Sequence, residues 1–195
     1  MELTILGATG GTGRELVRQA LERGHTVRPV SRSPRPGGVT ADVRDPAAIA
    51  LALKGAEVVL SGLGIANGEA PGALTAGARA AAESGARIVW LAALGTGPSA
   101  PVAGALTRAL LGTMMRKELP DRVAATETVL AAGGTVFHAG PLTDGPLSAA
   151  RRTMALPDVP RRLFPASVSR ATVAAAMLDE AESAVFAGQP VAVLG

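Results

Sequence analysis

Short apolar runs alternate along this chain with longer segments in which apolar residues recur every three or four positions. The runs are typical of strands buried on both faces, and the longer segments are typical of helices that cover a sheet. The expected strands lie at 3–6, 25–30, 39–41, 57–60, 86–91, 135–138 and 191–194. The expected helices lie at 14–23, 45–54, 71–83 and 169–186, with a longer helical region that contains 110–117 and breaks near Pro120.

Strands that alternate with helices of this length imply right-handed crossovers between parallel strands. We therefore expect a single α/β domain over residues 1–195, with a doubly wound parallel sheet and helices on both of its faces. The composition agrees, because 48% of the residues are hydrophobic and only 2% are aromatic, which favours a core of aliphatic layers. The Pro- and Arg-rich stretch 148–164 fits either a lid or an irregular surface loop.

The first strand leads directly into a glycine-rich turn and then into an amphipathic helix. The turn has the spacing G-x-x-G-x-x-G and consists of Gly7, Ala8, Thr9, Gly10, Gly11, Thr12 and Gly13. Glycines allow the backbone to approach a ligand closely, and the amides of the following helix N-terminus attract a pyrophosphate. The pattern predicts a Rossmann-like dinucleotide site, and the alternative is a tight turn that binds nothing.

The residues after the second strand indicate which dinucleotide would bind. Domains that select NAD place an acidic residue there for the ribose 2′-hydroxyl, whereas an arginine accommodates a 2′-phosphate. This chain has no acid at that place and has Arg32, Ser33 and Arg35 instead. A guanidinium group suits a phosphate bidentately, so we expect NADP(H), with a solvated basic loop as the alternative.

Further residues at the ends of expected strands complete the predicted cofactor site. They are Asp42 and Val43 after the third strand, Gly62, Leu63 and Gly64 after the fourth, and Ala92 and Ala93 after the fifth. Asp42 either accepts a hydrogen bond from the adenine amino group or has only a structural role. Asp45 precedes a proline and is expected to cap the N-terminus of a helix.

Charge and cysteine content exclude several other functions. The pI is near 10.5 although the net charge is only +3, because Cys and Tyr are absent and Lys is scarce, so little titrates before arginine. The sequence contains no basic stripe with interleaved aromatic residues, so nucleic-acid binding is not expected. With no cysteine and two distant histidines, a metal site is not expected. The apolar runs are too short to cross a bilayer, so we expect a cytoplasmic protein without membrane contact.

Nearly the whole chain resembles the atypical short-chain dehydrogenase/reductases that bind NAD(P)H, a group that includes the biliverdin-IXβ/flavin reductases and the NmrA-like redox sensors. The matching segments are 7–13, Arg32, 42–43, 62–64, 140–146, 168–174 and 188–193. The resemblance implies a nicotinamide cofactor and a redox role. It leaves the substrate open.

The chain also departs from this group. It has no tyrosine, so the Tyr-x-x-x-Lys acid pair of ordinary short-chain dehydrogenases cannot form. Val123 stands where many relatives have lysine, and Lys117 is expected to be solvated. The resemblance implies a substrate pocket near Leu94, His138 and Pro141. No catalytic residue is identified.

Two functions fit these observations. In the first, the protein is an NADPH-dependent oxidoreductase that passes hydride to a small flat acceptor, a flavin, quinone or tetrapyrrole, which takes its proton from water. In the second, it is an NmrA-like sensor that binds NADP(H) without turnover. The sequence predicts no oligomeric state.

Overall fold

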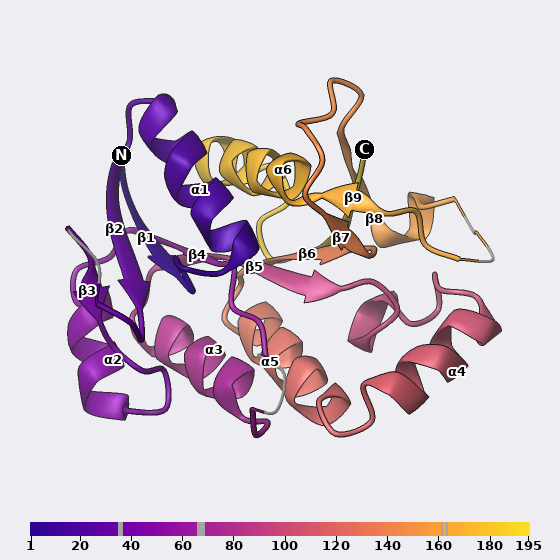
Figure 1. The fold of residues 1–195 in the computed structure, drawn as a ribbon, viewed down its shortest axis with the longest axis horizontal. Helices are drawn as coiled ribbons and strands as arrows, with labels where there is room; N and C mark the ends of the chain where they lie inside the picture. Colours follow the sequence, from indigo (N-terminus) through magenta and orange to yellow (C-terminus); the bar gives the residue numbers. More distant parts are fainter. Residues whose placement is uncertain (35–36, 66–68, 161, 163) are drawn as a thin grey trace.

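The computed structural model describes residues 1–195 except 35–36, 66–68, 161 and 163. Within the described residues, eight strands form one sheet in the order β3-β2-β1-β4-β5-β6-β10-β8 (Figure 1). All neighbours in this sheet are parallel except β10 and β8. The predicted doubly wound α/β fold is therefore confirmed.

The strands of the sheet are β1 Glu2–Leu6, β2 Thr26–Ser31, β3 Val39–Thr40, β4 Val58–Ser61, β5 Arg87–Ala93, β6 Thr135–Ala139, β8 Arg152–Ala155 and β10 Pro190–Leu194. The helices are α1 Gly11–Glu22, α2 Pro46–Leu53, α3 Ala73–Glu83, α4 Ala105–Met114, α5 Leu119–Ala131 and α6 Arg170–Ser183. Short 3₁₀ turns lie at Gly97–Ser99 and Leu156–Asp158, and β7 Leu142–Thr143 pairs with β9 Val168–Ser169 outside the main sheet.

Helices cover both faces of the sheet, as Figure 1 shows. Helices α1 and α6 lie on one face, and α2, α3 and α5 lie on the other. Successive residues of β1 serve opposite faces: Ile5 packs in the layer under α1 and α6, and Leu6 packs in the layer under α2, α3 and α5. Trp90 is the largest side chain of the second layer, which otherwise consists of aliphatic residues as expected.

Local sequence signals act at the helix ends where they were expected. The Asp45 carboxylate accepts hydrogen bonds from the amides of Ala47 and Ala48 and so caps α2. Gly24 follows α1 with φ of +79°, a left-handed conformation that glycine adopts without strain. The long helical region breaks before Pro120 into α4 and α5.

The stretch 148–164 differs from both of its expected forms. It contributes β8, which pairs antiparallel with β10 and extends the edge of the sheet. The described part of the stretch is therefore neither a lid nor an irregular loop throughout. The sequence did not predict this strand, because β8 consists of one exposed residue followed by three half-buried ones. Its sequence therefore shows neither a buried apolar run nor a clear alternation of apolar and polar residues.

Candidate functional site

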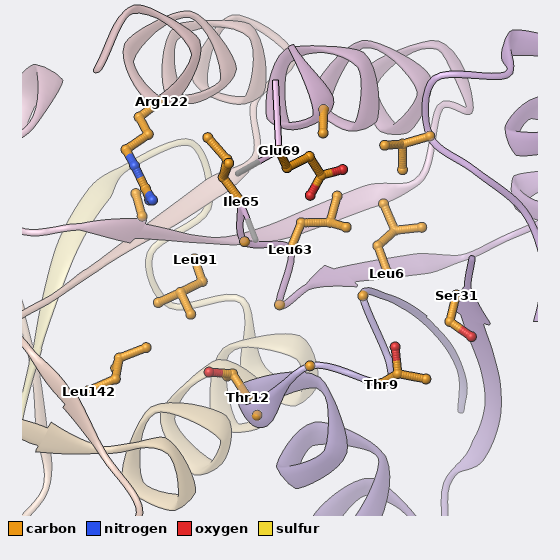
Figure 2. A pocket seen from close by; sticks show the side chains of 18 of the residues that line it. Leu6, Thr9, Thr12, Ser31, Leu63, Ile65, Glu69, Leu91, Arg122 and Leu142 are labelled. Atoms are coloured by element: carbon orange, nitrogen blue, oxygen red, sulfur yellow. The ribbon is translucent and has the colours of Figure 1, made fainter. Parts of the chain in front are cut away.

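A cleft of about 570 Å³ opens at the carboxyl ends of the central strands (Figure 2). The chain runs from β1 to β2 and β3 on one side, and to β4, β5 and β6 on the other, so the strand order reverses beside β1. Ligands of open α/β sheets bind at such a switch point, beyond the carboxyl ends of the strands. The cleft is thus at the place, and of the size, that a small organic ligand requires.

The glycine turn forms the floor of the cleft through close backbone contacts. Gly7 has φ of +71°, and its carbonyl oxygen accepts a hydrogen bond from the amide of Gly10 at 2.9 Å. A Cβ added to Gly13 would lie 2.7 Å from the carbonyl carbon of Gly7 and 2.9 Å from Cα of Ala8. A Cβ added to Gly62 would lie 2.9 Å from the Gly13 amide nitrogen. These glycines hold β1, α1 and the end of β4 in contact, as a dinucleotide turn requires.

The first turn of α1 points its amides at the cleft. Gly10 is the N-cap, and the amides at the beginning of an α-helix have no partner within the helix. The Arg14 side chain donates from Nη1 to the carbonyl oxygen of Thr9 at 2.8 Å and fixes the turn that precedes the helix. Amides and helix dipole together suit the negative charge of a pyrophosphate.

Arg170, the first residue of α6, adds a positive charge above this helix end. A Cβ added to Gly11 would lie 2.6 Å from Nε of Arg170, so the guanidinium covers the turn directly. Its Nη1 pairs with Oδ1 of Asp144 at 2.6 Å, and the Asp144 side chain is largely exposed. Arg170 was missed as a site residue, although it lies in one of the segments that carried the family resemblance.

Two arginines and one glutamate line the cleft beside the end of β2. Arg32 Nη1 lies 2.5 Å, and Arg44 Nη1 lies 2.6 Å, from the same Oε1 of Glu69. Arg44 also donates from Nη2 to the carbonyl oxygen of Ala70. Arg32 was predicted, whereas Arg44 and Glu69 were not.

Two predicted residues at this end, Ser33 and Asp42, are described and do not line the cleft. Ser33 offers its carbonyl oxygen to the Ser31 hydroxyl at 2.7 Å, and Asp42 accepts from the Arg44 amide at 2.9 Å. Asp42 thus shapes the turn that presents Arg44, which matches its structural alternative. Arg35 lies outside the described residues.

The opposite end of the cleft, at β5 and β6, is mostly apolar. Its walls comprise Leu63, Ile65, Leu91, Ala92, Ala93, Ala139, Gly140 and Leu142. Arg122 projects from α5 toward Leu91 and Ile65 in Figure 2. Its Nη2 pairs with Oε2 of Glu118 at 2.9 Å, while its Nε is buried and meets no hydrogen-bond acceptor among the described residues.

Asp121 holds α5 against the start of α3, which forms part of the cleft wall. Its carboxylate accepts from the amides of Gly72 and Thr75 at 2.8 and 2.9 Å and from the Thr75 hydroxyl at 2.6 Å. Burial opposes ionisation, but these hydrogen bonds outweigh it, so the pKa of Asp121 is lowered. The ionised carboxylate therefore caps α3 from a neighbouring helix.

The expected substrate pocket needs correction. His138 is fully buried in β6 and does not line the cleft; its Nδ1 lies 3.3 Å from the Ala93 carbonyl oxygen. Burial lowers the pKa of His138 to about 4, although the Ala93 contact opposes this, so the ring is neutral at pH 7. Leu94 borders a separate small cavity with Val102. Pro141 lies between two lining residues without lining the cleft itself.

The remaining predicted residues come together around the cleft. Gly7, Thr9, Gly10, Gly11, Thr12, Arg32, Val43, Gly62, Leu63, Gly64, Ala92 and Ala93 all line it. Ala8 and Gly13 are buried directly beneath, where Ala8 donates its amide to the Val30 carbonyl oxygen at 3.1 Å. A glycine cradle, a helix N-terminus and basic side chains fit a dinucleotide phosphate.

A sequence comparison now decides the family, since the model of the NAD(P)H-binding family matches residues 7–184. The chain belongs to the NAD(P)H-binding family. The predicted likeness to atypical short-chain reductases is thereby confirmed, together with a nicotinamide cofactor. No curated protein matches the chain in sequence.

Solved structures of similar fold cover essentially the whole NAD(P)H-binding chain. A protein from Burkholderia pseudomallei has 27% identity and a TM-score of 0.81, with 100% of both chains covered. ChuY, an anaerobilin reductase from Escherichia coli O157:H7, has 20% identity and a TM-score of 0.79, with 100% and 97% covered. The oxidoreductase YlbE from Lactococcus lactis has 16% identity and a TM-score of 0.79, with 99% and 90% covered. These similarities show that the chain shares its fold with all three proteins.

Among the described residues, none of the helices of this NAD(P)H-binding protein combines the length and the apolar character that crossing a bilayer demands.

Proposed function

We propose that the protein is an NADPH-dependent reductase that transfers hydride to a flat conjugated acceptor, such as a flavin, a quinone or a linear tetrapyrrole, without a side-chain acid. The observation that carries this proposal is the apolar wall at the ends of β5 and β6, which faces the same cleft as the glycine turn. The fold shared with an anaerobilin reductase also supports it. The proposal includes turnover in the cytoplasm.

In this proposal, the chain holds the cofactor by its phosphates. The amides at the start of α1 and the Arg170 guanidinium bind the pyrophosphate. Arg32 and Arg44 bind the 2′-phosphate, which favours NADPH over NADH by about tenfold to a hundredfold for one or two charge-assisted contacts. When bound, NADPH supplies the hydride.

The chain would promote the reaction by positioning rather than by proton donation. Leu91, Ala93 and Leu142 offer a smooth apolar surface on which an acceptor ring can lie against the nicotinamide. The ionisable residues among the described lining are Arg32, Arg44, Arg122, Arg170 and Glu69. Arginine does not give up its proton, and Glu69 lies at the adenosine end of the site. The acceptor therefore takes its proton from water.

The test is an NADPH oxidation screen over flavins, quinones and linear tetrapyrroles, scored by kcat/KM. We expect a primary isotope effect with 4-deuterated NADPH in single turnovers. The variants Lys117→Ala and His138→Ala should each keep kcat within about tenfold, less than the loss of a positioned general acid. A thousandfold loss in either variant, with unchanged NADPH affinity, would show that a side-chain acid exists.

A sensor of NADP(H) redox state is the second candidate, and one surface favours it. Leu106, Leu110 and Met114 follow one face of α4 at helical spacing, and each is about half exposed or more. A protein partner could cover such an apolar stripe. Tight NADPH binding without turnover of any acceptor would favour the sensor over the reductase.

A further inference from the structure

The carboxylate of Glu69 lies between two arginines at the place where the ribose 2′-position is expected. Its Oε1 is 2.5 Å from Arg32 Nη1 and 2.6 Å from Arg44 Nη1, and its side chain is only 14% exposed. Arg32 itself is 54% exposed and opens toward the cleft. Glu69 also lines the cleft, and Figure 2 shows its carboxylate directed into it.

The position of this cluster identifies the ligand group that it concerns. Arg32 directly follows Ser31, the last residue of β2, and this strand end holds the adenosine ribose in dinucleotide-binding folds. A 2′-phosphate carries up to two negative charges and would engage the same guanidinium groups that Glu69 now engages. The carboxylate therefore occupies the anion position that the two arginines form.

The two nicotinamide cofactors respond differently to this carboxylate. A 2′-phosphate must displace Glu69 from the arginines or lie against a like charge, and either event costs binding free energy. A 2′-hydroxyl disturbs neither ion pair, since it can donate a hydrogen bond to a carboxylate oxygen. Glu69 thus weakens the binding of NADPH and leaves the binding of NADH largely unaffected.

We propose that Glu69 is a specificity-determining residue that competes with the cofactor 2′-phosphate for Arg32 and Arg44. This inference rests on the proposed use of NADPH. Without Glu69, the two arginines would prefer NADPH over NADH more strongly. The inference therefore assigns to this one side chain the limit on that preference.

The test compares the wild-type protein with Glu69→Gln, which keeps the shape of the side chain and removes its charge. Calorimetry measures the binding of adenosine 2′,5′-bisphosphate and of adenosine 5′-monophosphate, which differ only in the 2′-phosphate. We expect Glu69→Gln to bind the bisphosphate about tenfold more tightly and the monophosphate within about twofold. NADPH and NADH should show the same contrast.

Glu57→Gln is the matched control because it removes the same charge at the far end of the sheet. Glu57 is exposed and immediately precedes β4, whereas the cleft lies beyond the other end of that strand. This variant should leave both nucleotide affinities within about twofold of the wild-type values. Thermal melts of both variants check that the fold is retained.

Each further outcome separates this inference from the proposed function. An unchanged bisphosphate-to-monophosphate ratio in Glu69→Gln, with NADPH turnover by the wild-type protein, overturns the role of Glu69 and leaves the reductase in place. Weaker bisphosphate binding by the folded variant also overturns it, because Glu69 would then position the arginines for phosphate. A wild-type protein that binds no adenine nucleotide overturns both.

Discussion

The substitution Gly13→Ala probes the contact on which the glycine turn depends. The added Cβ would lie 2.7 Å from the carbonyl carbon of Gly7 and closer still to its oxygen. Ordinary contacts begin near 3.4 Å, so the contact with the carbonyl carbon alone requires α1 and the end of β1 to separate by about 0.7 Å, and the closer contact with the oxygen requires more. Both partners are backbone, so no side-chain rotation can relieve the clash.

The cost of this substitution combines two opposed effects. Overpacking at a tight site costs about 3 kcal/mol, and the better helix propensity of alanine returns about 1 kcal/mol. A net loss of about 2 kcal/mol lowers the melting temperature of a domain of this size by about 4–8 °C. The displaced helix amides also bind the pyrophosphate less well, so NADPH affinity should fall by about tenfold to a hundredfold.

Thermal melts and calorimetric titration with NADPH measure the two effects, and Gly112→Ala provides the control. Gly112 lies within α4, and an added Cβ there meets no atom within 4 Å. The control variant should be stabilised by up to about 1 kcal/mol with unchanged NADPH affinity. A shift of about 2 °C corresponds to at most about 1 kcal/mol for a domain of this size. If Gly13→Ala melts within about 2 °C of the wild type and keeps its NADPH affinity, the turn is not packed as described.

Three further predictions concern stability and the acceptor end of the cleft. Asp121→Asn should lower the free energy of unfolding by about 2 kcal/mol at pH 7, as measured by urea unfolding. Because the pKa of Asp121 is lowered in the folded protein, the difference between variant and wild type should shrink as the pH falls below 3.8, the ordinary pKa of an aspartate. The buried His138 has a pKa of about 4 in the folded protein, whereas the same ring takes up a proton near pH 6.5 in the unfolded chain. The free energy of unfolding of the wild type should therefore fall by about 2 kcal/mol from pH 7 to pH 5, and that of His138→Leu should fall markedly less in the same urea assay. Arg122→Gln should raise the KM of an anionic acceptor by about tenfold with unchanged NADPH affinity, whereas the exposed Lys117→Gln should change neither in steady-state kinetics and titration.

The fold and the phosphate-binding end of the site could be predicted because their signals are local. The turn from Gly7 to Gly13 requires glycine by backbone geometry, and a strand and a helix flank it in the sequence. The N-cap role of Asp45 likewise depends on residues within one helical turn. Signals of this kind need no knowledge of how distant elements pack.

The residues that sequence reasoning missed reach the cleft only through tertiary packing. Glu69 meets Arg32 across 37 positions, and Arg122 enters the cleft because Asp121 fastens α5 to the start of α3. Arg170 reaches the glycine turn because α6 packs beside α1. No periodicity in the sequence records such approaches, and an arginine at a helix start looks the same whether it is solvated or faces a ligand.

The error at β6 has a different cause, which is the alternation of side chains along a strand. All of β6 is buried and His138 fully so, while Ala139, at the end of the strand, and Gly140, just beyond it, line the cleft. A shift of one position moves a side chain to the other face of the sheet, and the sequence fixes a strand end less precisely than that. At β6, the lining of the cleft therefore begins one residue later than the resemblance implied.

The positions of these arginines indicate more about ligand binding than the net charge of the protein does. A net charge of +3 is too small to indicate a polyanion-binding surface, yet Arg32, Arg44, Arg122 and Arg170 all line the same cleft, with Glu69 as the carboxylate among its described lining residues. Low-dielectric walls focus such a field and raise the local concentration of an anionic ligand. Removing the Glu69 charge would leave this field unopposed at that end of the cleft, and this is the electrostatic basis of our proposal that one carboxylate controls the preference between two cofactors that differ by one phosphate.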